Sequence, residues 1–116
     1  MITKFASFAL IALSATQALA DPAGFQTIEF EAPHHGRSVS GAVWYPAKDG
    51  GSPMTFAENP VFQGVEVLEG AAVAQGAHPV IALSHGMGGN IRSVAWLATR
   101  LAERGAVVIG VNHPNT

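Results

Sequence analysis

The residues best suited to chemistry form a glycine-rich run at positions 84–90, with the sequence SHGMGGN. Glycine has no Cβ, so it permits backbone turns that other residues avoid and lets N–H groups approach a ligand closely. The run follows an apolar segment and precedes an amphipathic one, which places it between a strand and the start of a helix. Because a helix N-terminus favours anions, this position is suited to contacts with negatively charged groups.

Two nucleotide-binding motifs use loops of this kind, and the residue spacing disfavours both. A dinucleotide-binding fingerprint needs Gly-x-Gly-x-x-Gly, whereas Gly86 and Gly88 are followed by Ile91 at the third glycine position. The acidic residue expected near the end of the next strand is missing too, since Asn112 stands there. A P-loop needs Gly-Lys-Ser or Gly-Lys-Thr, and the run 84–90 has no lysine. A nucleotide-binding βαβ protein is therefore the least favoured interpretation.

Two strands and a helix are predicted to position the run. Residues 79–83 and 106–111 are short continuous apolar segments, as in strands buried on both faces of a parallel sheet. Residues 91–103 carry an apolar stripe at helical spacing, made of Val94, Leu97, Ala98, Leu101 and Ala102. Asn90 is placed to cap the helix N-terminus, and Gly105 to take the left-handed position after the C-terminus. This order predicts a βαβ unit.

The preceding segment is predicted to begin with an antiparallel hairpin. Residues 25–30 alternate apolar and polar side chains, residues 33–37 form a turn, and residues 38–45 are rich in strand-forming types. Residues 47–60 are dense in Gly, Pro, Asp, Asn and Ser, which predicts a loop. Residues 61–76 are interrupted by glycines and are predicted to be mostly irregular.

The aromatic side chains are assigned to packing rather than to ligand binding. Four of them fit core positions of the hairpin: Phe25, Phe30, Trp44 and Tyr45. Trp96 falls on the polar side of the predicted helix, so we expect it to be partly exposed, with packing against another part of the chain as the alternative.

Residues 78–114 resemble the α/β-hydrolase superfamily, and more closely an exported bacterial branch similar to dienelactone hydrolases and platelet-activating-factor acetylhydrolases. The resemblance is carried by the strand leading into the glycine-rich run, by Trp96-Leu97-Ala98, by Gly105 and by Asn112-His113-Pro114. It implies an α/β fold, of which residues 21–116 would be the N-terminal part: an antiparallel hairpin followed by a βαβ unit, in an incomplete sheet. Strands one to four would span residues 25–30, 39–45, 80–84 and 107–111.

The same resemblance implies an exported serine hydrolase that acts on a small-molecule ester, lactone or lipid and needs no cofactor. Met87, the residue after His-Gly, would donate its backbone N–H to the oxyanion of the reaction intermediate, and its side chain would line the acyl pocket. Gly86, Gly88 and Gly89 would shape the turn, so a Cβ added at any of them should displace this donor. His85 would brace the loop through hydrogen bonds to backbone rather than act as the catalytic base.

The catalytic serine of that family is not found in this sequence. It would stand on a Gly-x-Ser-x-Gly elbow, followed in the chain by an acid and a histidine, and no serine here meets that pattern. We therefore expect the nucleophile, acid and base to lie beyond Thr116, and residues 21–116 alone to be inactive and poorly folded. The alternative is a secreted remnant without catalytic function that folds only with a partner, or not at all.

Residues 1–20 have the layout of a secretory signal peptide. Lys4 precedes an apolar run, and Ala18-Leu19-Ala20 offers small residues at the cleavage positions before Asp21. The apolar run is shorter than the roughly 20 residues that span a bilayer, and no cysteine follows it to carry a lipid, so a stable membrane anchor is disfavoured. We expect cleavage after Ala20 and export to the periplasm or the cell exterior.

The composition excludes several further classes of protein. The sequence has no cysteine, which removes disulfides, iron–sulfur clusters and cysteine nucleophiles. Its net charge is -2 and its Lys and Arg residues are scattered, which argues against nucleic acid as a partner. No metal site is predicted, because no helical pair or clustered triad occurs among the five histidines: His34, His35, His78, His85 and His113.

Overall fold

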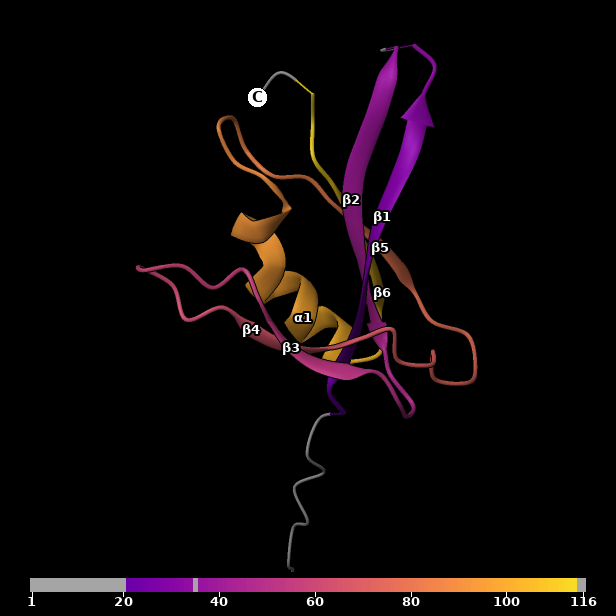
Figure 1. Cartoon of the computed structure of the whole chain (residues 1–116). Coiled ribbons are helices and arrows are strands. Elements are labelled where there is room, and N and C mark those ends of the chain that lie inside the picture. Colours follow the sequence, from indigo (N-terminus) through magenta and orange to yellow (C-terminus); the bar gives the residue numbers. More distant parts are fainter. Residues whose placement is uncertain (1–20, 35, 115–116) are drawn as a thin grey trace, which may run out of the picture.

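The computed structural model describes residues 21–34 and 36–114, so the signal peptide predicted at residues 1–20 lies outside the described residues. The described chain forms one mixed sheet, a short 3-10 turn and one α-helix (Figure 1). In chain order these elements are β1 (Ala23–Ala32), β2 (Arg37–Pro46), β3 (Ser52–Phe56), β4 (Val65–Glu69), β5 (Val80–Leu83), η1 (Ile91–Val94), α1 (Ala95–Glu103) and β6 (Val107–Val111). Among the described residues, no helix is long and apolar enough to span a membrane.

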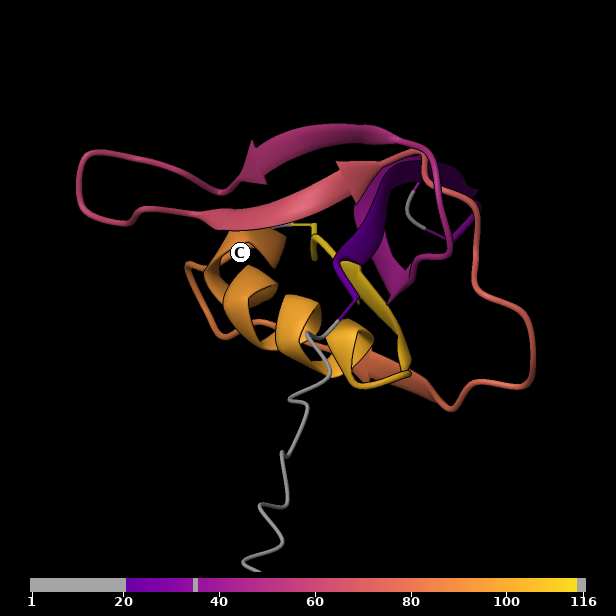
Figure 2. The ribbon, with the colours of Figure 1, turned by 90° about the horizontal axis from the view of Figure 1, so that it is seen from below.

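The sheet combines antiparallel and parallel pairing in the order β3-β4-β1-β2-β6-β5. β1 and β2 form an antiparallel hairpin, while β5 and β6 pair in parallel through the connection made by η1 and α1. Figure 2 shows α1 packed on one side of the curved sheet. The arrangement confirms the predicted α/β class and its order of a hairpin followed by a βαβ unit.

The hairpin extends further than the sequence pattern indicated. Its pairing runs without interruption along the whole of β1 and β2. Phe25 and Trp44 are partners in this register and are fully buried on the side that receives α1. The prediction that Phe30 belongs to the core is wrong, because the outer part of the hairpin projects beyond α1 and leaves this ring exposed (Figure 1).

Strands β3 and β4 correct two predictions, the loop over residues 47–60 and the mostly irregular stretch over residues 61–76. β3 and β4 pair antiparallel along their whole length, and β4 continues the sheet in parallel with β1. Across the pair, the Thr55 hydroxyl donates to the Glu66 carboxylate. Pairing with strands elsewhere in the chain stabilises these short segments, because β-propensity depends strongly on the neighbouring strands.

The predicted helix begins with the 3-10 turn η1 and becomes a regular α-helix at Ala95. Asn90 caps it as predicted, since its side chain accepts a hydrogen bond from the Arg92 N–H. Gly105 follows the C-terminus with a φ of 102°, also as predicted. The buried face is offset from the predicted apolar stripe and consists of small residues: Ala95, Ala98, Thr99 and Ala102.

β5 is an edge strand in the described chain, which corrects the prediction that both strands of the βαβ unit are buried on two faces. Its side chains alternate between exposed and half-buried, and Val80 is largely exposed. β6 lies between β2 and β5 and buries Val108 completely. The strand predicted over residues 80–84 ends one residue earlier, at Leu83.

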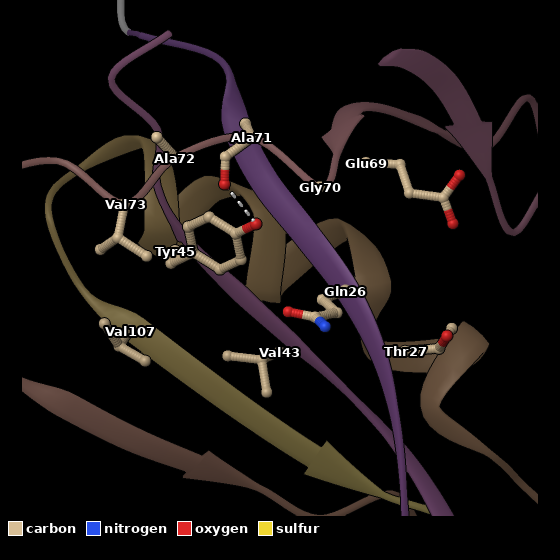
Figure 3. A pocket seen from close by; sticks show the side chains of 10 residues that line it. All are labelled: Gln26, Thr27, Val43, Tyr45, Glu69, Gly70, Ala71, Ala72, Val73 and Val107. Carbon is tan, nitrogen blue, oxygen red and sulfur yellow. Dashed lines mark hydrogen bonds between the residues drawn. The ribbon is translucent and has the colours of Figure 1, made fainter. Parts of the chain in front are cut away.

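The core forms where aromatic rings on the sheet meet α1. The ring centroid of Phe25 lies 5.3 Å from that of Trp44 and 4.5 Å from that of Phe56. On the opposite face of the sheet, the Tyr45 hydroxyl donates a hydrogen bond to the Ala71 carbonyl oxygen at 2.8 Å. Figure 3 shows Ala71 and Ala72 beside the Tyr45 ring. Burial raises the pKa of Tyr45 above its ordinary value of 10.0.

Candidate functional site

The glycine-rich run leaves β5 and reverses direction before η1 begins (Figure 1). The Gly89 N–H donates to the Gly86 carbonyl oxygen at 3.0 Å, which closes a β-turn around Met87 and Gly88. Gly88 has a φ of 74° at the third position of this turn, the value that a type II turn requires and that glycine adopts without strain. Backbone conformation therefore explains why glycine stands at position 88.

The other two glycines of the run differ in what surrounds them. A Cβ at Gly89 would lie 3.1 Å from the Gly86 carbonyl oxygen and 3.2 Å from Ser93 Oγ, both tighter than ordinary contacts. A Cβ at Gly86 would meet nothing within 4 Å, and the φ of Gly86 lies outside the left-handed region. The prediction that any Cβ in the run displaces the donor is therefore wrong for Gly86, whose surroundings are open.

Met87 stands at the open end of the turn, with 99% of its surface exposed. Its N–H donates no hydrogen bond to any residue that the structure describes. An exposed N–H without an internal partner is available to an oxygen atom of a ligand. Because the side chain packs against nothing, the backbone donor and the side chain can be altered separately.

His85 is the buried residue of the run, with 7% of its surface exposed. Its Nε2 accepts a hydrogen bond from the His113 N–H at 3.2 Å, and its Nδ1 lies 2.9 Å from the Gly86 carbonyl oxygen. A neutral imidazole with its proton on Nδ1 satisfies both contacts. The ring thereby connects the beginning of the turn to the chain that follows β6.

Ser84 and His113 join the ends of the two parallel strands. Ser84 Oγ lies 2.8 Å from His113 Nε2, and the rings of His85 and His113 are 4.5 Å apart between centroids. A hydroxyl beside an imidazole is also the pair that nucleophilic catalysis uses. Ser84 nevertheless lacks the Gly-x-Ser-x-Gly elbow that exposes such a nucleophile, so we assign this pair to holding the strand ends together.

Asn112, which follows β6, anchors the far end of the run. Its Oδ1 accepts a hydrogen bond from the Ile91 N–H at 2.9 Å, and its Nδ2 donates to Ser40 Oγ at 2.9 Å. Its own N–H donates to the Ser40 carbonyl oxygen at 2.8 Å. With Asn90 capping η1, the run is held at both ends while Met87 stays open in the middle.

A cleft of about 670 Å³ opens beside the run, between the segment 57–64 and the start of α1. Gly88 and Gly89 line it on one side, while Phe62 and Trp96 line it from the two flanking elements. This volume falls in the range of small-molecule sites. Trp96 is 62% exposed, as its place on the polar side of the helix predicts. No local sequence pattern indicates that residues 57–64 reach the site.

The histidines outside the run have separate surroundings. His34 lies exposed in the turn after β1, His35 lies outside the described residues, and the His78 ring contacts the carbonyl oxygens of Ala74 and Gly105. In the described ranges 21–34 and 36–114, no group of three or more His, Cys, Asp or Glu side chains is arranged to hold a metal ion.

The sheet order and the glycine-rich turn after a parallel strand define an α/β fold. A ferulic acid esterase from Streptomyces cinnamoneus superposes on this chain with a TM-score of 0.69 and 27% sequence identity. The match covers 85% of this chain and 35% of the esterase chain, so the chain spans about a third of that enzyme's length. No protein-family model matches the sequence, and no significant match is found among curated proteins. The similarity supports an esterase-like fold for this chain.

Proposed function

We propose that this chain supplies the oxyanion-stabilising loop of a serine hydrolase acting on carboxylic esters or lactones. The observation that carries the proposal is the exposed N–H of Met87, in a turn whose ends are anchored by His85 and Asn112. During ester hydrolysis negative charge develops on the carbonyl oxygen, and a donor fixed in place beforehand stabilises that charge without reorganisation. The esterase fold of the structural neighbour supports the same class of reaction.

The complete reaction also needs a nucleophile, an acid and a base, and we assign none of these roles to residues 21–116. The proposed substrate is a small ester, lactone or lipid, because acyl transfer by a serine requires no cofactor. We further propose that residues 1–20 direct export to the periplasm or the cell exterior, with cleavage after Ala20.

The test alters Met87 in the intact protein. Met87→Pro removes the N–H, whereas Met87→Ala keeps it and removes only an exposed side chain. We expect Met87→Pro to lower kcat for a 4-nitrophenyl ester by about 10²- to 10³-fold, the cost of losing one oxyanion donor. Met87→Ala keeps the N–H, so its kcat should fall far less than that of Met87→Pro.

A fluorophosphonate probe, which labels activated serines, provides a second readout. Labelling together with selective loss of kcat in Met87→Pro would support the proposal. An intact protein that neither hydrolyses esters nor reacts with the probe would refute serine hydrolysis. Equal kcat values for the two variants would show that the Met87 N–H is not the donor.

A further inference from the structure

The His78 ring connects two parts of the chain that lie far apart in the sequence. His78 is half-buried and lies between the exposed residues 75–77 and the start of β5. Its Nε2 lies 2.8 Å from the Ala74 carbonyl oxygen, and its Nδ1 lies 3.2 Å from the Gly105 carbonyl oxygen. Because Gly105 follows the C-terminus of α1, the ring joins the chain before β5 to the end of the helix.

Both contacts of this ring are made to hydrogen-bond acceptors. A carbonyl oxygen only accepts, so each ring nitrogen needs a proton to form a hydrogen bond with it. The neutral imidazole carries a single N–H and would turn the lone pair of its other nitrogen toward a carbonyl oxygen. The protonated ring donates from both nitrogens, and the C-terminal end of a helix favours a positive charge as well. The surroundings of His78 therefore match the protonated ring.

A comparison with His85 shows that this arrangement is specific to His78. The Nε2 of His85 faces a donor, the His113 N–H, while its Nδ1 faces an acceptor, the Gly86 carbonyl oxygen. One proton satisfies both of these contacts, whereas the two acceptors around His78 require two. Of these two histidines, only His78 therefore gains a hydrogen bond when it takes up a second proton.

The charged and titratable side chains around His78 belong to elements on either side of the ring. They are Glu103 and Arg104 at the end of α1, Lys48 and Asp49 on the segment bonded to Ala72, and Tyr45, which donates to Ala71. Residues 70–77, β5 and β6 contain no titratable side chain. Among the described residues, no ion pair or hydrogen bond joins any charged side chain to the His78 ring. The two carbonyl groups are therefore the partners that respond to its charge.

We propose that His78 is a proton-dependent clasp, in which the protonated ring holds Ala74 and Gly105 together and loss of one proton releases one of the two contacts. In the described chain β5 is an edge strand that pairs with β6 alone, so the clasp strengthens the attachment of its first residues. The next contact along the chain is the hydrogen bond from the Val107 N–H to the Pro79 carbonyl oxygen, 2.8 Å long. The inference does not depend on the proposed ester hydrolysis.

The clasp predicts the sign of a pH dependence. Histidine in an unfolded chain takes up its second proton near pH 6.5, a value of about 6.5 being ordinary for this side chain. Because the protonated ring makes one more hydrogen bond in the folded chain, folding favours that form. The stabilising effect is therefore complete below about pH 6.5 and is lost at higher pH, as the folded chain gives up the proton in turn.

The test compares urea unfolding of the intact wild type and of His78→Gln at about pH 5 and about pH 8, the two ends of the range in which histidine titrates. Glutamine donates through its amide but stays uncharged. We expect the unfolding equilibrium constant of the variant to exceed that of the wild type by about 5- to 30-fold at the lower pH. The difference should shrink at the higher pH, where both side chains donate one hydrogen bond.

His34→Gln is the matched control, because it makes the same exchange at an exposed position in the turn after β1. Its effect on unfolding should be the same at both pH values. A second measurement needs no variant: nitrogen NMR of the histidine rings in the intact wild type should show two N–H protons on His78 at the lower pH and one at the higher pH.

Three outcomes would overturn the inference. The first is a His78→Gln variant whose effect on unfolding is the same at both pH values. The second is an equal pH dependence in His34→Gln, which would assign the effect to the general loss of a histidine. The third is a His78 ring with a single N–H proton at about pH 5, which would mean that the folded chain does not favour the protonated ring.

Discussion

Asn112→Ala tests whether the chain after β6 positions the glycine-rich run. The Asn112 side chain makes two hydrogen bonds that bridge separate parts of the fold, one accepted from the Ile91 N–H and one donated to Ser40 Oγ, both 2.9 Å long. The first bond satisfies an N–H at the start of η1, where backbone donors have no partner within the helix. Its removal should loosen the end of the run that faces η1.

The expected magnitude follows from these contacts. Each hydrogen bond contributes about 1 kcal/mol, and a buried donor left without a partner costs about 1–3 kcal/mol. Ile91 is buried, whereas Ser40 is exposed and can bond to water instead. We therefore expect Asn112→Ala to lower the free energy of unfolding by about 2–3 kcal/mol, most of it from the Ile91 N–H. Typical domain stabilities of about 5–15 kcal/mol would leave such a variant folded.

Two variants separate the contributions. Asn112→Asp keeps an acceptor for the Ile91 N–H and adds negative charge at a helix N-terminus, so it should lose less than about 1 kcal/mol. Ser40→Ala removes only the exposed partner and should cost no more than about 1 kcal/mol. Urea unfolding of the intact protein measures the free energy of unfolding. The kcat for a 4-nitrophenyl ester reports how well the glycine-rich run positions the Met87 N–H. Asn112→Ala should lower kcat with little change in KM, because the role proposed for the Met87 N–H is to stabilise the transition state.

Equal destabilisation by Asn112→Ala and Ser40→Ala would mean that the hydrogen bond from the Ile91 N–H contributes nothing, contrary to this prediction. An Asn112→Ala variant that loses stability but keeps its kcat would show that Asn112 supports the fold without positioning the donor. Asn112→Asp distinguishes a lost acceptor from a lost amide, because it retains only the acceptor.

Two further predictions follow from single positions. Gly88→Ala should cost about 1 kcal/mol of unfolding free energy and reduce kcat, because the φ of 74° is unfavourable for a residue with a Cβ, while Gly86→Ala should be neutral in urea unfolding. Equal losses in these two variants would contradict the turn geometry. Burial raises the pKa of Tyr45 above 10.0, so its stabilising effect is complete below pH 10.0 and is lost as the pH rises through the raised value. Tyr45→Phe should remove that alkaline loss of stability, and an unchanged pH profile would assign the loss to another group.

The sequence predicted the parts of the fold whose signals are local. The alternation in β1 and the strand-forming residue types in β2 lie within each strand, and the turn between them is short. Asn90 and Gly105 are residue types whose preference for the two ends of a helix is intrinsic, so both were placed correctly. In the same way, the spacing within the run 84–90 was enough to locate the turn.

The elements that were missed depend on partners distant in sequence. β3 contains Pro53 and follows two glycines, a composition that indicates a loop until β4 is present to pair with it. The helix stripe was misplaced for a different reason. Trp44 and Phe25 occupy the sheet face, so the fully buried face of α1 consists of small side chains such as Ala98, while Leu101 packs at the edge of the core and is only partly buried.

The contacts that hold the run in place could not be predicted, for the same reason. The resemblance carried by the run suggests Met87 as a donor, which stays a prediction, but it gives no information on these contacts. Asn112 stands at the end of a strand, where polar residues gather near functional loops, and that position was the available signal. The Asn-Pro pair at positions 59 and 60 marks a turn, but nothing local shows that the turn brings Phe62 to the cleft.

An oxyanion donor must satisfy two opposing requirements, because it has to be fixed in place and yet have no partner. Most backbone N–H groups in a folded chain are paired, and a loop that loses its anchors tends to pair them internally. Here the hydrogen bond from the Gly89 N–H to the Gly86 carbonyl oxygen closes the turn, and the His85 and Asn112 side chains anchor its ends. The Met87 N–H therefore has no partner among the described residues. Weakening either anchor should therefore reduce kcat more than the loss of global stability alone would suggest, since a small local rearrangement is enough to redirect the N–H.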